Sequence, residues 1–164
     1  MKTKDLTIEQ LHQYFMEHIR YEIQMLLNAT SAIRQSLPVP RGVEHMPVES
    51  YAIHLRNLIT FLYPPHPPRD SDVCAKDFFV KENTWAEIRP VLDESLENAR
   101  IRANKEIGHL TTLRQSGTPE SKQWDVKKLS AELLPLIKLF AESADKVKID
   151  SDLEDLLAYH SKIS

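Results

Sequence analysis

The side chains best suited to chemistry lie in a basic stretch from Arg100 to Arg114. Helical spacing places Arg102, Glu106 and His109 on one strip of a helix surface. A histidine exchanges protons near neutral pH and an arginine holds phosphate, so this strip suits phosphodiester chemistry. Gly108 costs a helix roughly 1 kcal/mol relative to Ala, which indicates close approach of another backbone or of a ligand. The alternative interpretation is a solvated, salt-bridged helix face.

A second polar group stands in the segment His54-Leu55-Arg56-Asn57. On a helix His54 and Asn57 share a face with Phe61, beside the apolar stripe. In an antiparallel bundle this segment lies level with His109, so we expect His54, Arg56 and Asn57 to form a supporting polar cluster. The alternative is a buried hydrogen-bond network between two helices, in which His54 and Asn57 bond to each other or to the backbone.

Helical periodicity dominates the chain, which has only three glycines and few alternating apolar runs suited to strands. The pattern predicts four main helices, a short helical piece within an irregular crossover and a tail helix. Their expected ranges are 8–36, 47–63, 84–110 and 126–140 for the main helices, 73–79 for the short piece and 153–160 for the tail.

Capping signals and prolines mark the ends of these helices. Thr7 with Gln10 and Thr84 with Glu87 have capping-box spacing, and a proline cluster ends the second helix. Proline interrupts helices, so Pro90 is expected to split off the first turn of the third helix, and a proline at position 135 to kink the fourth. Helices joined in this way predict an all-α fold, an antiparallel four-helix bundle that forms one domain over residues 1–164.

The charge, cysteine content and apolar runs of the chain limit which partners and compartments we expect. Twenty-one Lys and Arg against 24 Asp and Glu give a formal charge of −3. The chain therefore has no overall positive charge that would indicate binding to nucleic acid or to a membrane. The single cysteine, Cys74, cannot form an internal disulfide, and we interpret it as a small buried residue of a protein in a reducing compartment. The absence of a secretory signal or a long apolar run leads us to expect a cytoplasmic protein without a membrane partner. There is no glycine-rich phosphate loop, and we expect no cofactor.

Three segments together resemble bacterial helical proteins of the HEPN type. The resemblance extends from about Ser50 to Arg114 and rests on His54-Leu55-Arg56-Asn57-Leu58, Asp77-Phe78-Phe79 and Asn104-Lys105-Glu106-Ile107-Gly108-His109-Leu110-Thr111. HEPN domains are helical bundles, often dimeric, and many are metal-independent ribonucleases of toxin or defence systems. Their signature is an arginine and a histidine a few residues apart. Arg102 and His109, with six residues between them, meet its loose form.

The resemblance implies a role for each residue of this signature. His109 would assist proton transfer at the RNA 2′-hydroxyl, Arg102 would stabilise charge on the phosphate, and Asn104 would orient them. RNA, a second copy of the chain and an antitoxin protein are the partners that it implies. Active members usually place a polar residue directly after the arginine, where this chain has Ala103. Other members bind RNA, nucleotides or a protein without catalysis, and this alternative stays open.

Two further interpretations compete with these. Glu9 with His12 and Glu106 with His109 have the Glu-x-x-His spacing of di-iron bundles, although an up-down bundle would place the two pairs near opposite ends. The main rival is a non-enzymatic helical interaction module, such as a homodimer whose long first and third helices bury apolar surface against a second copy. Exposed aromatic residues would then anchor a partner, or else form the edge of the core, and the candidates are Phe78, Phe79 and Trp124.

Overall fold

The structure is a computed structural model that describes residues 3–36, 38, 40–65, 67–108, 112–115, 118 and 122–163. These residues form helices and connecting turns, with no strand among them, so the all-α prediction is confirmed. In chain order the elements are η1 (Thr3–Asp5), α1 (Ile8–Tyr14), η2 (Phe15–Ile19), α2 (Arg20–Arg34), α3 (Met46–Leu62), η3 (Ala75–Phe78), α4 (Thr84–Ile88), α5 (Glu94–Ala103), η4 (Asn104–Gly108), η5 (Thr112–Gln115), α6 (Val126–Ser143) and α7 (Leu153–Ile163).

The first predicted helix is present as the continuous run of α1, η2 and α2. Its capping box forms as expected, because the Gln10 amide donates to Thr7 Oγ1 at 3.2 Å and the Thr7 amide donates to Gln10 Oε1 at 2.9 Å. The π-helical segment η2 in its middle was not predicted. Such a segment widens one turn locally and shifts the direction of the side chains that follow it.

The second predicted helix is also present, since α3 has a proline in its first turn and ends before the proline cluster. The third predicted helix is divided in two. Pro90 lies in an extended connection between α4 and α5, and the Asp93 carboxylate caps α5 by accepting from the Ser95 amide at 2.8 Å. The capping box expected at Thr84 and Glu87 is wrong, because Asn83 holds the cap position without a side-chain hydrogen bond.

The last two helices agree with the prediction in their order. α6 runs through the proline at position 135, and α7 covers the expected tail helix. The short 3₁₀ segment η3 lies within the predicted helical piece of the crossover. In the described part of the chain, no helix combines the length and the apolar character that crossing a bilayer requires.

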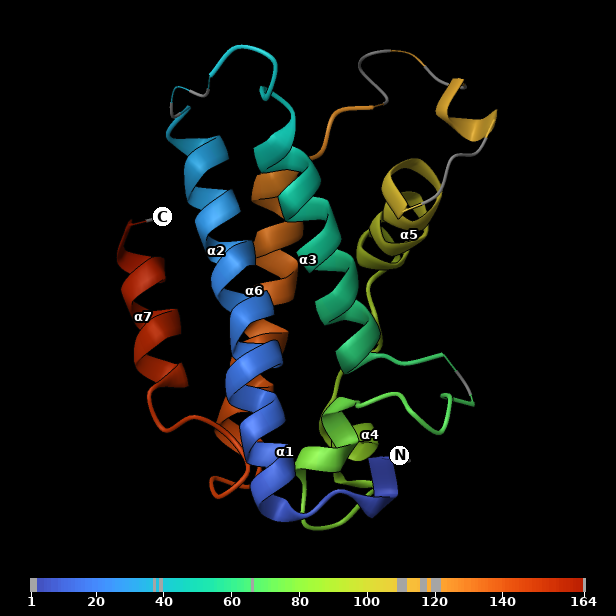
Figure 1. The fold of residues 1–164 in the computed structure, drawn as a ribbon, viewed down its shortest axis with the longest axis vertical. Helices are drawn as coiled ribbons and strands as arrows, with labels where there is room; N and C mark the ends of the chain where they lie inside the picture. The colour runs from blue at the N-terminus through green and yellow to red at the C-terminus, as the bar shows by residue number, and fades with distance from the viewer. Residues whose placement is uncertain are drawn as a thin grey trace.

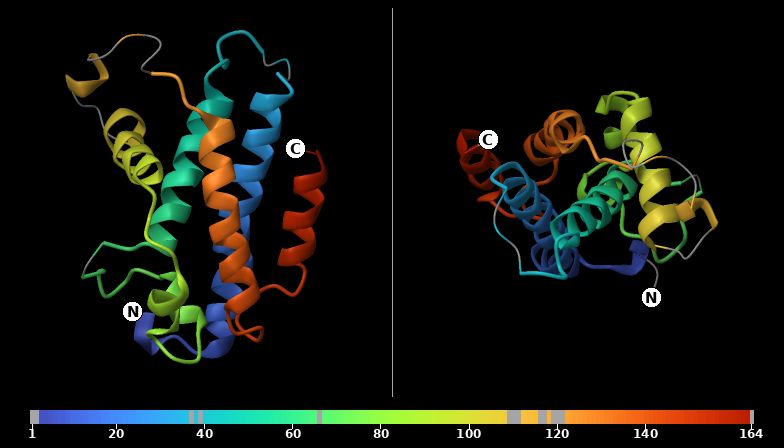
Figure 2. Two further views of the ribbon diagram at one scale, coloured as in Figure 1. Left: turned by 180° about the vertical axis from the view of Figure 1, so that it is seen from behind. Right: turned by 90° about the horizontal axis from the view of Figure 1, so that it is seen from above.

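Three long helical elements stand side by side in Figure 1: the α1–α2 run, α3 and α6. α2 and α3 are antiparallel and share the most extensive contact of the fold, while α5 packs chiefly on the outer side of α3. Figure 2 shows from above that α7 covers the side of the molecule formed by α2 and α6, opposite α5. The predicted four-helix bundle is therefore not confirmed in detail, because α5 is short and a fifth helix joins the assembly.

An aromatic cluster forms the centre of the core beneath these helices. The ring of Phe140, on α6, lies within 5.2 to 6.4 Å of five other aromatic rings. All five are buried, so Phe78 and Phe79 are core residues and do not serve as exposed anchors for a partner. Phe61 belongs to the same cluster and also reaches the groove described below, which links the core to the candidate site.

Candidate functional site

A groove of about 690 Å³ opens between α2, α3 and the α5–η4 helix, and we call it the interhelical groove. Its polar lining includes Glu22 from α2, Arg56 and Asn57 from α3, and Arg100 and Asn104 from α5 and η4. The crossover after α3 forms another part of its wall. Residues far apart in the sequence thus meet around one concave surface.

Arg56 is a half-buried cation of this groove that has no carboxylate partner among the described residues, whereas Arg69, which also lines the groove, is exposed. Its side chain is half-buried and lies beside η4, with Nη1 3.5 Å from the position that a Cβ of Gly108 would occupy. Among the described residues, no hydrogen bond or ion pair engages its guanidinium. The close approach expected at Gly108 is therefore made by an arginine side chain at ordinary contact distance. A desolvated guanidinium without a partner favours an anionic ligand.

Two asparagines and a second arginine also belong to the polar lining of the groove. Arg100 is held by Glu97 one turn earlier, with Nε and Nη2 donating at 2.9 and 2.6 Å. Asn57 and Asn104 line the groove from facing elements, α3 and η4. The helix that carries Asn57, α3, contacts η4, while the expectation that His54 and Asn57 lie level with His109 stays a prediction because His109 lies outside the described residues. Amide side chains supply both donors and acceptors, which suits a ligand of mixed polarity.

Glu22 is one of the residues of this site that sequence reasoning missed. Its Oε2 lies 2.7 Å from His54 Nδ1 and accepts from Asn57 Nδ2 at 3.1 Å. Because a carboxylate accepts, Nδ1 is the ring nitrogen that carries the hydrogen. The alternative prediction of a polar network between two helices is thus correct in kind, but His54 and Asn57 share an acidic partner from α2. His54 is buried, and its ring also packs edge-on against Tyr21.

Arg102 faces another part of the molecule. Its Nε donates to Glu106 at 2.8 Å, Nη1 donates to the Gln123 carbonyl at 2.9 Å, and Nη2 donates to the Lys122 carbonyl. The guanidinium carbon lies 4.3 Å from the centre of the Trp124 ring, a cation–π contact. Arg102 therefore connects the end of α5 to the segment that precedes α6.

The structure does not bring the predicted catalytic residues together in one site. Asn104 lines the interhelical groove and Arg102 does not, so these two side chains do not converge. His109 lies outside the described residues. The catalytic roles of Arg102, Asn104 and His109 stay predictions.

Two π-helical segments flank the groove, and neither was expected from sequence. His18 belongs to η2 and Asn104 begins η4, and both residues line the groove. The His18 ring pairs with that of Tyr14, another lining residue, at a centroid distance of 4.6 Å. Burial raises the pKa of Tyr14 above its usual range. π-helical turns occur frequently at functional sites, so their position here supports the choice of this groove.

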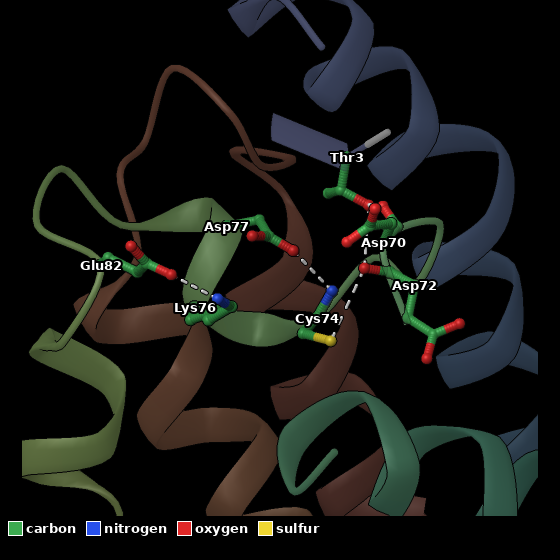
Figure 3. A network of polar contacts seen from close by, with 7 residues as sticks. All are labelled: Thr3, Asp70, Asp72, Cys74, Lys76, Asp77 and Glu82. Carbon is green, nitrogen blue, oxygen red and sulfur yellow. Dashed lines mark hydrogen bonds and ion pairs between the residues drawn. The ribbon is translucent and has the colours of Figure 1, made fainter. Parts of the chain in front are cut away.

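The crossover wall of the groove is held by a local polar network, drawn in Figure 3. The Asp77 carboxylate accepts from the Cys74 amide at 2.7 Å, and Thr3 Oγ1 donates to the Asp72 carbonyl at 2.9 Å. Burial, followed by the nearby Asp77 and Asp72 carboxylates, raises the pKa of Cys74 to about 11. A thiol with so high a pKa is a poor nucleophile near neutral pH, which agrees with the interpretation of Cys74 as a structural residue.

The described residues do not form the metal site that the Glu-x-x-His spacing suggested. Within the described ranges, no group of three or more His, Cys, Asp or Glu residues is close enough to hold an ion. Of the two Glu-x-x-His pairs, Glu106 is engaged by Arg102, and His109 lies outside the described residues.

Comparison with protein-family models, with curated proteins and with solved structures finds no match to this chain. The fold and the site themselves describe an all-helical protein with a polar, arginine-bearing groove between its helices.

Proposed function

We propose that this chain binds a phosphate-bearing ligand, RNA in single-stranded form, in the interhelical groove, as a HEPN-like binding module. The observation that carries the proposal is Arg56, a half-buried guanidinium in a groove with no carboxylate bonded to it in the described part of the chain. Phosphate oxygens match the fork of donors on a guanidinium, and a buried arginine is stabilised by such a partner.

The size and the lining of the groove support a nucleotide ligand. A volume of about 690 Å³ falls in the range of roughly 300–1,000 Å³ typical of small-ligand sites. Single-stranded RNA is recognised by stacking of its bases on aromatic side chains combined with phosphate contacts. The Tyr14 and His18 rings supply an aromatic wall, while Arg56 and Arg100 supply the positive charge. The carboxylates of Glu22 and Asp72 limit that charge, so we expect modest affinity.

The geometry favours binding over cleavage by the predicted pair. To hold a scissile phosphate, Arg102 would have to leave Glu106, two backbone carbonyls and the Trp124 ring. These contacts together hold the guanidinium in place at one surface of α5. Arg56 needs no such rearrangement, because it has no competing polar partner in the described structure.

The test is the affinity of the purified chain for a short fluorescent single-stranded RNA, measured by anisotropy at low ionic strength. Removing an arginine that contacts phosphate should weaken binding, and we expect Arg56→Gln to lower the affinity about tenfold. Arg41→Gln is the matched control, because it removes the same charge from an exposed turn outside the groove. Equal affinities for Arg56→Gln and Arg41→Gln would contradict the proposal.

A cleavage assay separates binding from catalysis. The wild type, Arg102→Ala and His109→Ala are incubated with RNA in the presence of a chelator, and the folding of each is checked by circular dichroism. The binding proposal predicts intact RNA in all three samples. Chelator-resistant cleavage that both substitutions abolish would instead support the ribonuclease implied by the resemblance.

A further inference from the structure

The acidic residue of the interhelical groove carries information about which nucleic acid would bind there. Glu22 stands on α2, with its side chain 22% exposed, among groove residues that include the arginines. A carboxylate repels phosphate, so its presence in an anion-binding groove calls for a separate explanation. The inference that follows rests on the proposed binding of a nucleic acid in this groove.

The Glu22 carboxylate is fixed in position by one of its two oxygens. His54 Nδ1 and Asn57 Nδ2 both approach Oε2, at 2.7 and 3.1 Å. Oε1 has no hydrogen-bond partner among the described residues, and it is not sealed from solvent. The result is a pre-oriented acceptor with unused capacity at the groove wall.

One groove thus holds an acceptor and a guanidinium that has no polar partner in the described part of the chain, and this pair matches a ligand with a phosphate and a neighbouring hydroxyl. Arg56 offers donors only and Glu22 offers acceptors only. Ribose hydroxyls are donors that stand next to the phosphates of RNA, and the 2′-hydroxyl is the group that DNA lacks. A site that holds such a hydroxyl disfavours the analogue without it, because its acceptor is then left unpaired.

We infer that Glu22, positioned by His54 and Asn57, accepts a hydrogen bond from a ribose 2′-hydroxyl and thereby makes the groove selective for RNA over DNA. Glu22 is a specificity residue in this account, and Arg56 provides affinity for the phosphate of either nucleic acid. Experiments can separate the two roles, because they belong to two side chains of opposite charge, Glu22 on α2 and Arg56 on α3.

The experiment compares a short oligouridylate with the matched oligodeoxyuridylate, which differs from it only in the 2′-hydroxyls. We expect the wild type to bind the RNA about tenfold more tightly, the value of one charge-assisted hydrogen bond. Glu22→Gln should lose most of this preference while DNA binding is unchanged or slightly stronger, because a repelling charge is gone. Glu17→Gln, which removes the same charge from a residue of the same helical run outside the groove, should keep the preference.

The outcomes distinguish this inference from the proposed function. Equal wild-type affinities for RNA and DNA, both reduced by Arg56→Gln, would overturn ribose selectivity and leave phosphate binding standing. Selectivity that Glu22→Gln retains would also overturn it. Failure of the wild type to bind either oligonucleotide would overturn both. The wild-type comparison needs no variant, so a folding defect in Glu22→Gln does not block the test.

Discussion

Arg56 and Gly108 lie against each other where α3 meets η4, with the guanidinium Nη1 3.5 Å from the position of a Cβ on Gly108. That distance is ordinary van der Waals contact, so a methyl group fits there without moving the backbone. The glycine is therefore not required for packing in the described structure. The arginine that it adjoins is the residue on which phosphate binding depends in our account.

Gly108→Ala should consequently stabilise the protein. A helical glycine loses more conformational freedom on folding than alanine does, and we expect a gain of about 0.5–1 kcal/mol in the free energy of unfolding. Urea unfolding followed by circular dichroism measures it, and RNA affinity should change little. A loss of more than about 1 kcal/mol would show that Gly108 is needed for close packing.

Arg102 should matter for stability. It joins the end of α5 to the backbone of residues 122–123 and stacks on Trp124. Among the described residues, Arg100 bonds only to Glu97, within its own helix. We expect Arg102→Gln to lower the free energy of unfolding by about 2 kcal/mol. Arg100→Gln removes a pair one turn apart and should cost less than about 0.5 kcal/mol.

Urea midpoints of these two variants, taken with the wild type, check the contrast. Arg102→Gln should also leave RNA affinity within about threefold of wild type, because its guanidinium does not line the groove. Similar stability losses in the two variants would contradict the connecting role of Arg102.

Cys74 should react slowly while the protein is folded. It is buried, and its pKa is raised to about 11, so the thiolate fraction at neutral pH is small. We expect labelling by an aromatic disulfide reagent at pH 7 to be slower than in denaturant by at least about a hundredfold. Rapid labelling of the native chain would contradict the burial of the thiol. Cys74→Ala serves as the blank.

Tyr51 should make the protein sensitive to alkali. Burial raises its pKa to about 12 from 10.0, so the folded state holds the phenolic proton more tightly than the unfolded state does. This contribution is complete below pH 10 and is lost as the pH rises toward 12. The linkage relation gives a loss of up to roughly 2–3 kcal/mol over that range.

Unfolding measured against pH in a Cys74→Ala background, with and without Tyr51→Phe, separates the contribution of Tyr51, because burial also raises the pKa values of Cys74, Tyr14 and Tyr63. Tyr51→Phe should flatten the alkaline decline. At pH 7 it should cost about 1 kcal/mol, since Tyr51 Oη is 3.1 Å from Ser130 Oγ and donates to the Val126 carbonyl at 3.4 Å. An unchanged alkaline slope in Tyr51→Phe would assign the decline to other groups.

Local signals were enough to predict most of the helices. Thr7 with Gln10 forms the capping box that its spacing indicates, and the proline at position 47 starts α3 as expected. The third helix was predicted to begin at Thr84 because the capping spacing there resembles that of Thr7. A helix, α4, does begin at Thr84, and Pro90 separates it from the rest as expected, but the capping box is absent and the Asp93 cap starts α5 at Glu94.

The site was harder to predict because it depends on contacts between distant residues. Arg56, Arg100 and Arg102 look alike in the sequence, and only the fold shows that Arg102 is engaged by the segment before α6 while Arg56 is not. Glu22 follows no spacing motif in the sequence, and its pairing with His54 spans 32 residues. His18 and Asn104 belong to π-helical turns, and the spacing of apolar residues did not predict these turns.

The most direct test of the central claim is an NMR titration of the side-chain amides of asparagine with single-stranded RNA. Asn57 and Asn104 line the interhelical groove, whereas Asn28 and Asn83 lie outside it and provide internal controls. We predict that the resonances of Asn57 and Asn104 shift progressively with added RNA while those of Asn28 and Asn83 remain in place. Shifts confined to the control residues, or none at saturating RNA, would contradict the account.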